Sequence, residues 1–488
     1  MCSFLILPLE IYRKIQNNMK KILKFLKKRG PDGTNIIEFN NYVFIHNILY
    51  FSGDITYQPL IDKELGIVLC FNGEIYNYKD FGNYKSDTEM LFEEYKKNKT
   101  NDLNFIEKLD GEFTFVIFDF NKNIIFQSSD IFATKPQWYN ITDDGIIISS
   151  LRSVVCKCSG LEDEFSERNL EFPNSPDIIK HKSIKKTNPN KILKRDLKSF
   201  EIIDEKEVFK FDLNQHKSSY DDWTKAFENA IKKRTKNNNT QENNIGLCLS
   251  SGYDSGAISC YLNKSEINYI SYSMKCLENL EILHKRMNLN KNKYYYDLTE
   301  ETYNQFKDFY QKSIEGTCIP LYSNSKTITS HYNLIGDWAG VGLFFIFTQA
   351  KNDKIKIFLS GQGADEIFSD YGWKGRYIKT LHSNTINPTI PCSFYGDFPD
   401  DLEEIFPWPN FYHSQNEAFI AKEEHVATIF GIETRYPFFD KFVVQEFLWL
   451  SKELKNKDYK APLFNYLQSN NYPFEPNEKM GFKAKITK

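Results

Sequence analysis

Residues 245–256 read IGLCLSSGYDSG and decide the fold of the larger part of the chain. The run Ile245–Leu249 is apolar and follows a polar loop, Arg234–Asn244, which predicts a short buried strand. A tight turn and a helical pattern come next. A second strand–turn–helix unit begins at Ile355–Phe358. Strands that alternate with helices are typical of a parallel sheet, so we expect an α/β domain here.

The loop Leu249–Gly256 carries hydroxyl groups and glycines between the predicted strand and helix. Backbone N–H groups at the start of a helix bind phosphate, and the helix dipole favours its charge. The loop lacks Gly-Lys-[Ser/Thr] and is therefore not a Walker A loop. A second Gly-rich loop, Ser360–Glu366, is by itself equally well a tight turn. Two such units, each with an aspartate, suit a triphosphate with Mg²⁺, so Asp254 and Asp365 are predicted to bind the metal.

The first part of the chain shows many short strand patterns and few helices. One helical repeat of apolar residues runs from Ile15 to Leu26, with lysines on the other face. This arrangement favours a layered β-sandwich with helices outside. The predicted strands are Cys2–Leu7, Tyr42–His46, Ile67–Asn72, Phe113–Asp119, Ile124–Ser128 and Gly145–Ser149.

The composition changes between Pro173 and Lys210, where Lys, Pro and Asn are frequent. We interpret this stretch as the tail of the first domain running into a linker. A helix follows it, with Ser219 as the expected N-cap. The chain therefore divides into two domains, residues 2–204 and 205–488.

The bulk composition excludes several classes of protein. The 488 residues carry a formal net charge of −3, which gives no reason to expect nucleic acid or an anionic membrane as partner. Nine cysteines occur without a CxxC pair, which predicts reduced thiols in a cytoplasmic compartment. No apolar run is long enough to span a membrane, and Met1–Leu9 lacks the basic start of a signal peptide. The sequence leaves a homodimer open.

Cys2 stands directly behind Met1, and removal of Met1 would leave a thiol and a free α-amine on one residue. The thiolate is the nucleophile of cysteine chemistry. An α-amine has a pKa of about 7.7–8.0 and can accept the thiol proton near neutral pH. Taken alone, an ordinary small residue at this position is the more economical interpretation.

Three further segments of the first domain carry polar groups in loops and turns. Each has a structural interpretation: a loop clamp for Arg29, a turn for Gly73, and a helix cap for Ser86 with Glu89 in a capping box. The segments are Arg29–Asp32, Phe71–Asn77 and Ser86–Glu89.

Together with Cys2, Leu109–Phe113 and Lys135-Pro136, these segments resemble the class II glutamine amidotransferase domain over roughly residues 2–140. The resemblance implies a four-layered αββα N-terminal-nucleophile hydrolase domain. It implies that Cys2 attacks the side-chain amide of glutamine, while its α-amine shuttles the proton. The Asn72 amide and the Gly73 N–H would hold the oxyanion. The other glutamine-binding residues implied are Arg29, which supports the nucleophile's loop, and Glu74 and Asp87, which bind the α-amine.

One departure concerns the glutamine carboxylate. The family grips it with an arginine in a His-x-Arg-Leu segment, and the matching residue here is Ile48. Isoleucine cannot make a bidentate clamp, so either another cation takes this role or glutamine binds weakly. A milder change is Ala133 for the glycine of a Gly-x-Lys-Pro segment.

The second part of the chain resembles the synthetase domain of glutamine-hydrolysing asparagine synthetase over residues 220–482. The resemblance rests on both loops, on Gly431–Asp440 (GIETRYPFFD), on Glu478–Phe482 (EKMGF) and on Lys460 before Ala461-Pro462-Leu463. It implies an ATP-pyrophosphatase, HUP-like, α/β nucleotide-binding domain. Lys479 would stabilise charge while a carboxylate attacks the α-phosphorus. The implied ATP-binding residues are Leu249, Ser250, Ser251, Gly252, Asp254, Ser255, Met274, Ser360 and Gly361.

Further departures lie in this domain. Ser251 replaces the first glycine of the family's Ser-Gly-Gly-x-Asp-Ser loop, and this restricts the backbone if the position needs a positive φ. Asp337–Gly342 stands where the family has a Thr-Thr-x-Arg segment at the aspartate site, and it contains no arginine. Gln362 stands where asparagine synthetases usually have a glutamate.

The sequence therefore predicts a ligase that takes ammonia from glutamine, adenylates a carboxylate with ATP and Mg²⁺, and forms an amide. Aspartate is the default acceptor, which makes asparagine synthetase the expected activity. One alternative is an amide-forming or lactam-forming synthetase acting on another acid. A different class, a divergent glutaminase or a scaffold without ligase chemistry, is supported by Ile48, Ser251 and Gln362.

Overall fold

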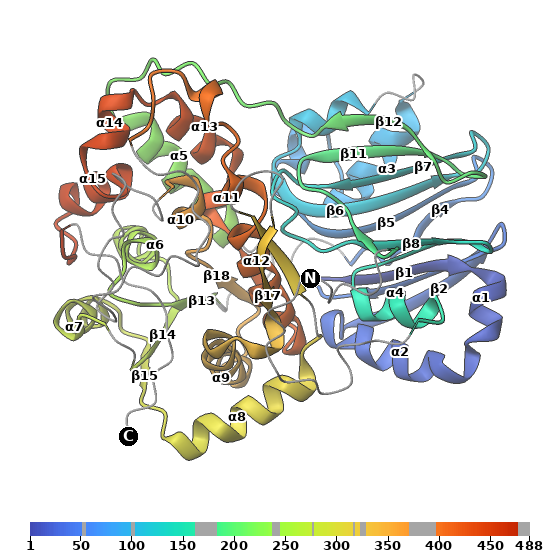
Figure 1. Cartoon of the computed structure of the whole chain (residues 1–488), viewed down its shortest axis with the longest axis horizontal. Helices are drawn as coiled ribbons and strands as arrows, with labels where there is room; N and C mark the ends of the chain where they lie inside the picture. Colours follow the sequence, from blue (N-terminus) through green and yellow to red (C-terminus); the bar gives the residue numbers. More distant parts are fainter. Residues whose placement is uncertain are drawn as a thin grey trace.

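The protein consists of two domains placed side by side, and the start of the chain lies between them (Figure 1). Among the residues that the structure describes, no helix is both long and apolar enough to cross a membrane. The computed structural model describes residues 1–50, 55–98, 103–161, 183–236, 245–275, 278–315, 318–322, 328–369 and 397–476.

The first domain contains two six-stranded sheets packed face to face. In the first sheet, β1 lies between β9 and β3, and Ser3 pairs with Asn47. The first sheet is, in spatial order, β10 (Lys185–Lys186), β8 (Trp138–Thr142), β9 (Gly145–Ser149), β1 (Ser3–Pro8), β3 (Tyr42–Ile48) and β2 (Gly33–Phe39). The second is β12 (Ile202–Glu207), β11 (Lys191–Asp196), β7 (Ile124–Ser129), β6 (Gly111–Asp119), β5 (Ile67–Ile75) and β4 (Leu60–Asp62).

Alternation along the strands builds the layers of this domain. Phe4 and Ile6 of β1 join the core between the sheets, whereas Leu5 and Leu7 pack under the helices. The helices on that outer side are α1 (Leu9–Lys14), α2 (Gln16–Arg29) and α4 (Arg152–Cys158). On the second sheet's outer face lies α3 (Asp87–Lys97), near the short turns η1 (Tyr78–Phe81) and η2 (Asn104–Lys108). The predicted αββα fold is confirmed.

The interpretation of 173–210 as tail and linker is wrong in part. β10, β11 and β12 lie in this stretch, and β11 pairs with β7 to extend the second sheet. Every residue of β12 except Lys206 is exposed, so this edge strand shows no apolar alternation. Because Glu207 still pairs with Lys191, the boundary after residue 204 would cut β12, and we propose to place it after Glu207.

The second domain is built on a parallel sheet, as predicted. Counted along the chain, its strands stand in the order 3-2-1-4-5, which places a switch point between β13 and β18. Ligands bind in such sheets beyond the carboxyl ends of the strands at the switch point. The strands are, in spatial order, β15 (Lys293–Tyr296), β14 (Ile270–Met274), β13 (Ile245–Cys248), β18 (Ile357–Leu359) and β19 (Glu433–Arg435).

Helices and a small hairpin surround this sheet. The first helix begins one residue later than predicted, because its N-cap is Tyr220 and not Ser219, and it includes Arg234 of the predicted loop. The helices are α5 (Asp221–Thr235), α6 (Tyr253–Lys264), α7 (Leu280–Leu289), α8 (Glu300–Ser313), α9 (Trp338–Asn352), α10 (Ala364–Ile367), α11 (Pro409–Tyr412), α12 (Gln415–Ile429), α13 (Lys441–Trp449), α14 (Lys452–Lys457) and α15 (Ala461–Ser469). The short turns η4 (Leu334–Gly336), η6 (Leu402–Glu404) and η7 (Pro437–Phe439) and the hairpin β16 (Cys318–Tyr322)–β17 (Ile328–Asn333) complete the domain.

Buried ion pairs join the two domains. Arg234 of α5 donates from Nε to Glu112 Oε1 of β6 at 2.7 Å and from Nη1 to Asp440 Oδ2 at 2.7 Å. All three side chains are almost completely buried. The surrounding carboxylates keep the pKa of Arg234 above its ordinary value despite burial.

Replacing Arg234 with methionine is expected to lower the free energy of unfolding by about 3–5 kcal/mol, because two buried carboxylates each lose a buried cationic partner. Lys225→Met on the same helix is the control, since Lys225 is 72% exposed and pairs with Asp222 at 3.3 Å. A surface pair of this kind contributes at most about 1 kcal/mol. Urea unfolding followed by tryptophan fluorescence measures both variants, and equal midpoints would contradict this account of the interface.

Candidate active sites

Cys2 lies at the entrance to β1, on the side that faces the second domain. Its backbone N–H donates to Asn72 Oδ1 at 2.8 Å, and its Sγ lies 4.0 Å from the carbonyl oxygen of Leu49. Burial raises the pKa of the Cys2 thiol to about 11, so the thiol needs a base to become a nucleophile. In the chain with Met1 attached, the Cys2 nitrogen is an amide. Removal of Met1 turns that nitrogen into an amine beside its own thiol.

Asn72 presents an unused donor at this place. Because a backbone N–H only donates, its contact with Asn72 fixes Oδ1 toward Cys2 and turns Nδ2 away. That Nδ2 is buried and has no hydrogen-bond partner among the described residues. The next residue, Gly73, has φ 137°, and a Cβ there would lie 2.1 Å from the Glu112 carbonyl oxygen. Only glycine fits at this position.

Arg29, the last residue of α2, holds Cys2 in place. Its Nε donates to the Cys2 carbonyl oxygen at 2.8 Å, and its Nη2 donates to Glu424 Oε2 at 2.8 Å. Arg29 therefore holds the backbone of Cys2 and also ties it to α12 of the second domain.

Glu74 and Asp87 lie near each other, and the charge of Asp87 contributes to raising the pKa of Glu74. Ser86 caps α3 by accepting from the Glu89 N–H at 3.1 Å, as predicted, and Asp87 Oδ2 accepts from the Ile75 N–H at 3.0 Å. Burial raises the pKa of Glu74 and of Asp87 above the ordinary values. Two carboxylates that are costly to charge in the fold favour a cationic group between them.

Ile48 lies on β3 opposite Gly33 and is 8% exposed. A Cβ at Gly33 would meet Ile48 Cγ2 and the Tyr57 ring at 3.2 Å each, so this corner is apolar. A cation from the second domain, Arg435, does approach the predicted glutamine residues. Its Nη2 lies 3.6 Å from Glu74 Oε1, at the amine end of the predicted site.

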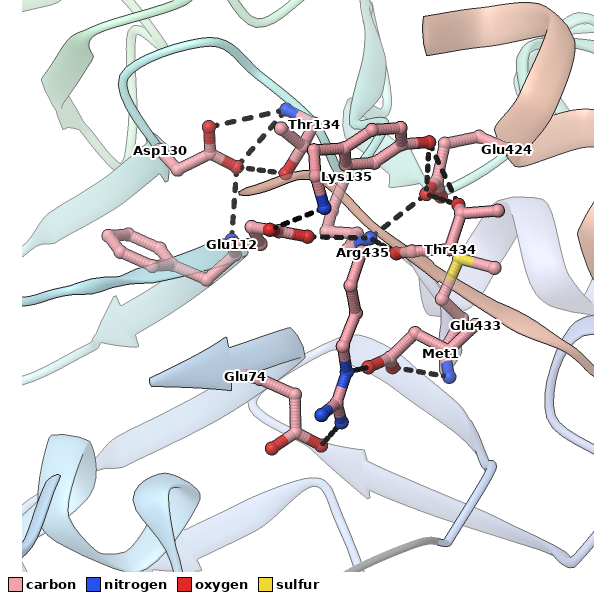
Figure 2. A network of polar contacts seen from close by, with 12 residues as sticks. Met1, Glu74, Glu112, Asp130, Thr134, Lys135, Glu424, Glu433, Thr434 and Arg435 are labelled. Carbon is pink, nitrogen blue, oxygen red and sulfur yellow. Dashed lines mark hydrogen bonds and ion pairs between the residues drawn. The ribbon is translucent and has the colours of Figure 1, made fainter. Parts of the chain in front are cut away.

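Figure 2 shows a network of polar contacts that joins residues near Cys2 to β19 and α12 of the second domain. The Met1 amine lies 3.0 Å from Glu433 Oε2, and both groups are buried. Lys135 Nζ donates to Glu424 Oε1 and to the Thr434 carbonyl oxygen, each at 2.9 Å. The sequence motifs contain Lys135, Glu433 and Arg435, but nothing in the motifs shows that they meet across the interface.

The loop after β13 is folded as a cradle at the switch point. Ser250 N–H donates to Ser255 Oγ at 3.0 Å, and Gly252 N–H donates to Ser250 Oγ at 3.2 Å. The buried Arg286 donates from Nη1 to the carbonyl oxygens of Ser250 and Gly252, at 2.7 Å each. This fixes the loop from behind, and no sequence pattern pointed to Arg286.

Ser251 does not adopt a positive φ, so a side chain at this position causes no backbone strain. Its N–H donates to Glu278 Oε2 at 2.8 Å, and burial raises the pKa of Glu278 to about 7. Leu249 and Met274, predicted to bind ATP, are buried in the core, and the Leu249 N–H already donates to Tyr272. The side chains of Leu249 and Met274 therefore form part of the core beneath the predicted ATP site.

Asp254 and Asp365 are brought together as predicted, on either side of Lys460. Lys460 Nζ lies 2.6 Å from Asp254 Oδ1 and also forms an ion pair with Asp365. Gly361 permits the close approach, because a Cβ there would lie 3.0 Å from Asp254 Cβ. Carboxylate oxygens are the ligands that Mg²⁺ prefers, so two converging carboxylates suit a metal bound with phosphate.

The remaining predicted residues surround this centre. Ser360 Oγ accepts from the Gln362 N–H at 3.0 Å, and Gln362 Nε2 donates to Glu366 Oε2 at 3.0 Å. Asp337 caps α9 and lies 3.4 Å from Lys422 Nζ, so a lysine stands near the segment that lacks the expected arginine. Lys479 and the rest of Glu478–Phe482 lie outside the described residues.

Comparison with known proteins matches both halves of the chain in order. A family model described as glutamine amidotransferase domain matches residues 1–201, and one described as asparagine synthase matches residues 320–418. A putative glutamine-hydrolysing asparagine synthetase of Methanocaldococcus jannaschii is 26% identical over 90% of this chain and 79% of its own length.

Two further relatives carry the same name. The asparagine synthetase of Gallus gallus is 26% identical over 88% of this chain and 73% of its own length. Asparagine synthetase 1 of Bacillus subtilis is 23% identical over 72% of this chain, which spans only 55% of that relative. The chain therefore resembles a glutamine amidotransferase domain followed by an asparagine synthase region, in the order in which they match.

Proposed function

We propose that this protein is a glutamine-dependent ligase that adenylates a carboxylate and converts it into an amide. The observation that carries the proposal is the position of the chain start. The Cys2 N–H is held by Asn72 Oδ1, whose amide keeps an unused donor, while the Met1 amine reaches Glu433 in the other domain. A nucleophile for amide cleavage therefore lies on the boundary with a nucleotide-binding fold.

In the first domain, the Cys2 thiolate attacks the amide carbon of glutamine after its proton passes to the α-amine. Asn72 Nδ2 and the Gly73 N–H stabilise the oxyanion. The ammonium form of the α-amine returns the proton to the leaving nitrogen, ammonia departs, and water hydrolyses the thioester to glutamate. Glu74 and Asp87 hold the glutamine ammonium group.

In the second domain, a carboxylate oxygen of the acceptor attacks the α-phosphorus of ATP, and pyrophosphate leaves. The backbone of Ser250–Ser255 faces the phosphates from the start of α6. We propose that Asp254 and Asp365 hold Mg²⁺, which neutralises phosphate charge when it is bound. Lys460 supplies a positive charge between the same carboxylates, and Lys479 takes the role that the family resemblance gives it.

Ammonia must reach the second domain without entering water, where it would be protonated. The buried Met1 side chain and amine stand between Cys2 and Glu433, so removal of Met1 vacates space on the direct line between the domains. We propose a cytoplasmic location as well, since Cys2 must remain a thiol and Cys70, Cys158 and Cys260 are also free thiols.

Aspartate is the proposed acceptor. Lys422, beside Asp337, is a cation of the acceptor side that can replace the missing arginine. Pyrophosphate release with ATP, Mg²⁺ and glutamine, measured with aspartate and with other acids, tests the choice. Release that needs aspartate is the expected result, whereas release with another acid alone supports a different amide-forming synthetase. Glutamate without pyrophosphate for any acid would indicate a glutaminase and contradict the proposal.

The KM for glutamine is expected to fall as the pH rises toward 8. Burial raises the pKa of Glu74 to about 8, so the neutral form prevails at lower pH and binds an ammonium group poorly. Glu74→Gln should raise the KM and flatten this pH dependence. Glutamate production by the mature enzyme, from which Met1 has been removed, measures the KM and its pH dependence. Glu64→Gln in an exposed turn is the control. An unchanged pH profile in Glu74→Gln would contradict the assignment.

A further inference from the structure

α12 runs along the boundary between the domains and contacts α2 on one side and β19 and α9 on the other (Figure 1). Two adjacent glutamates near its middle point to different places. Glu424 faces the amidotransferase domain, where it binds Arg29 and Lys135. Glu423 faces the synthetase centre, where the Ser360 hydroxyl is near enough to lower the pKa of its carboxyl group.

The second oxygen of Glu423 has no such contact. Glu423 Oε2 is buried and has no hydrogen-bond partner within the described part of the chain. A buried carboxylate oxygen without a donor is costly, so a bound molecule that supplies an N–H would relieve this cost. Ser360 directly follows β18, which pairs with β13 at the switch point, so the Glu423 carboxyl group lies beside the predicted nucleotide site.

We propose that Glu423 is the general base of amide formation and takes a proton from ammonia as its nitrogen bonds to the activated carbonyl. This inference rests on the function proposed above. The position of Glu423 favours contact with ammonia rather than with the acceptor. An acceptor carboxylate would be repelled by Glu423, whereas an N–H donor is attracted. Ammonia also arrives from the side on which Glu424 meets Arg29.

The step balances without another reactant. The nitrogen lone pair of ammonia attacks the carbonyl carbon of the acyl-adenylate, and a tetrahedral intermediate forms. Glu423 removes one proton from that nitrogen. The C–O bond to the phosphate then breaks, AMP leaves with the electron pair, and the neutral amide remains beside a protonated Glu423.

The charges around Glu423 suit a base that works near neutral pH. Burial is the largest effect and raises the pKa of Glu423 to about 7, and Glu424 adds to the increase. Lys422, Lys135 and the Ser360 hydroxyl act in the opposite direction. Such a value matches a base that must be ionised before reaction and protonated after it.

Glu423→Gln tests the proposal in the mature enzyme. Amide formation should fall by about 10²–10⁴-fold, the usual contribution of a general base. Glutamate production and a pre-steady-state burst of pyrophosphate should persist, because neither needs this base. The acid limb of the pH profile of amide formation should disappear in Glu423→Gln, and Glu423→Asp should keep part of the rate. Glu417→Gln, in the first turn of the same helix, is the control for loss of a carboxylate from α12.

Three results would overturn the inference: wild-type amide formation in Glu423→Gln, a higher KM for the acceptor at unchanged kcat, or loss of the pyrophosphate burst in a variant with a normal melting temperature. A failure of the proposed function looks different. In that case the wild-type enzyme cleaves glutamine but forms no amide from any acid, and the inference fails with it.

Discussion

Replacing Cys2 with alanine is expected to abolish glutamine-dependent amide formation, with a loss of at least about 10⁴-fold. The alanine variant keeps the α-amine, Asn72 and Gly73 but has no atom that can form the thioester. Ammonium chloride should restore amide formation to near the wild-type level, because the synthetase centre lies in the other domain. Glutamate, pyrophosphate and amide are measured in parallel.

Cys158→Ala is the matched control, since it removes a thiol that is 3% exposed and belongs to the core under the outer helices of the first domain. It should leave both reactions within a few-fold of wild type. Glutamate production by Cys2→Ala at the wild-type rate would contradict the assignment of the nucleophile.

Replacing Asp254 with asparagine is expected to impair the synthetase reaction and to leave glutamine cleavage intact. Pyrophosphate release should fall by about 10³-fold with either glutamine or ammonia, because a metal-assisted charge stabilisation of several kcal/mol is lost. Lys460 would also keep only Asp365 of its two carboxylate partners. Glutamate production should continue, since the Cys2 site contains no part of this loop.

Asp222→Asn on α5 is the control for this variant, because Asp222 is half exposed and pairs with Lys217 and Lys225. Raising the Mg²⁺ concentration should recover part of the Asp254→Asn activity if the carboxylate is a metal ligand. Full pyrophosphate release by Asp254→Asn at low Mg²⁺ would contradict the proposed metal site.

The parts of the protein that follow local rules could be predicted from the sequence. β1, the loop after β13 and the cap at Ser86 depend on apolar runs, glycines and hydroxyls that are close together in the chain. The edge strand β12 was missed because it buries almost nothing, and its polar composition is that of a linker.

The contacts between distant segments could not be predicted in this way. Lys460 meets Asp254 across 206 positions, and Arg29 meets Glu424 across 395 positions. Arg286 and Glu423 belong to no motif, and only their burial behind or beside the loops gives them a role. Ile48 remains a departure from the family pattern in the folded protein. The corner around it is apolar, and Arg435 approaches the predicted glutamine site from the end that binds the α-amine.

Transfer of nitrogen between the two sites can be followed with an isotope label. The mature enzyme is supplied with ATP, Mg²⁺, aspartate and glutamine labelled with ¹⁵N in the side-chain amide, and unlabelled ammonium is added in excess. We expect the amide product to carry mostly ¹⁵N, since ammonia passes from Cys2 to the adenylate inside the protein. An amide that carries the unlabelled nitrogen of the solution, or glutamate formed without any amide, would contradict it.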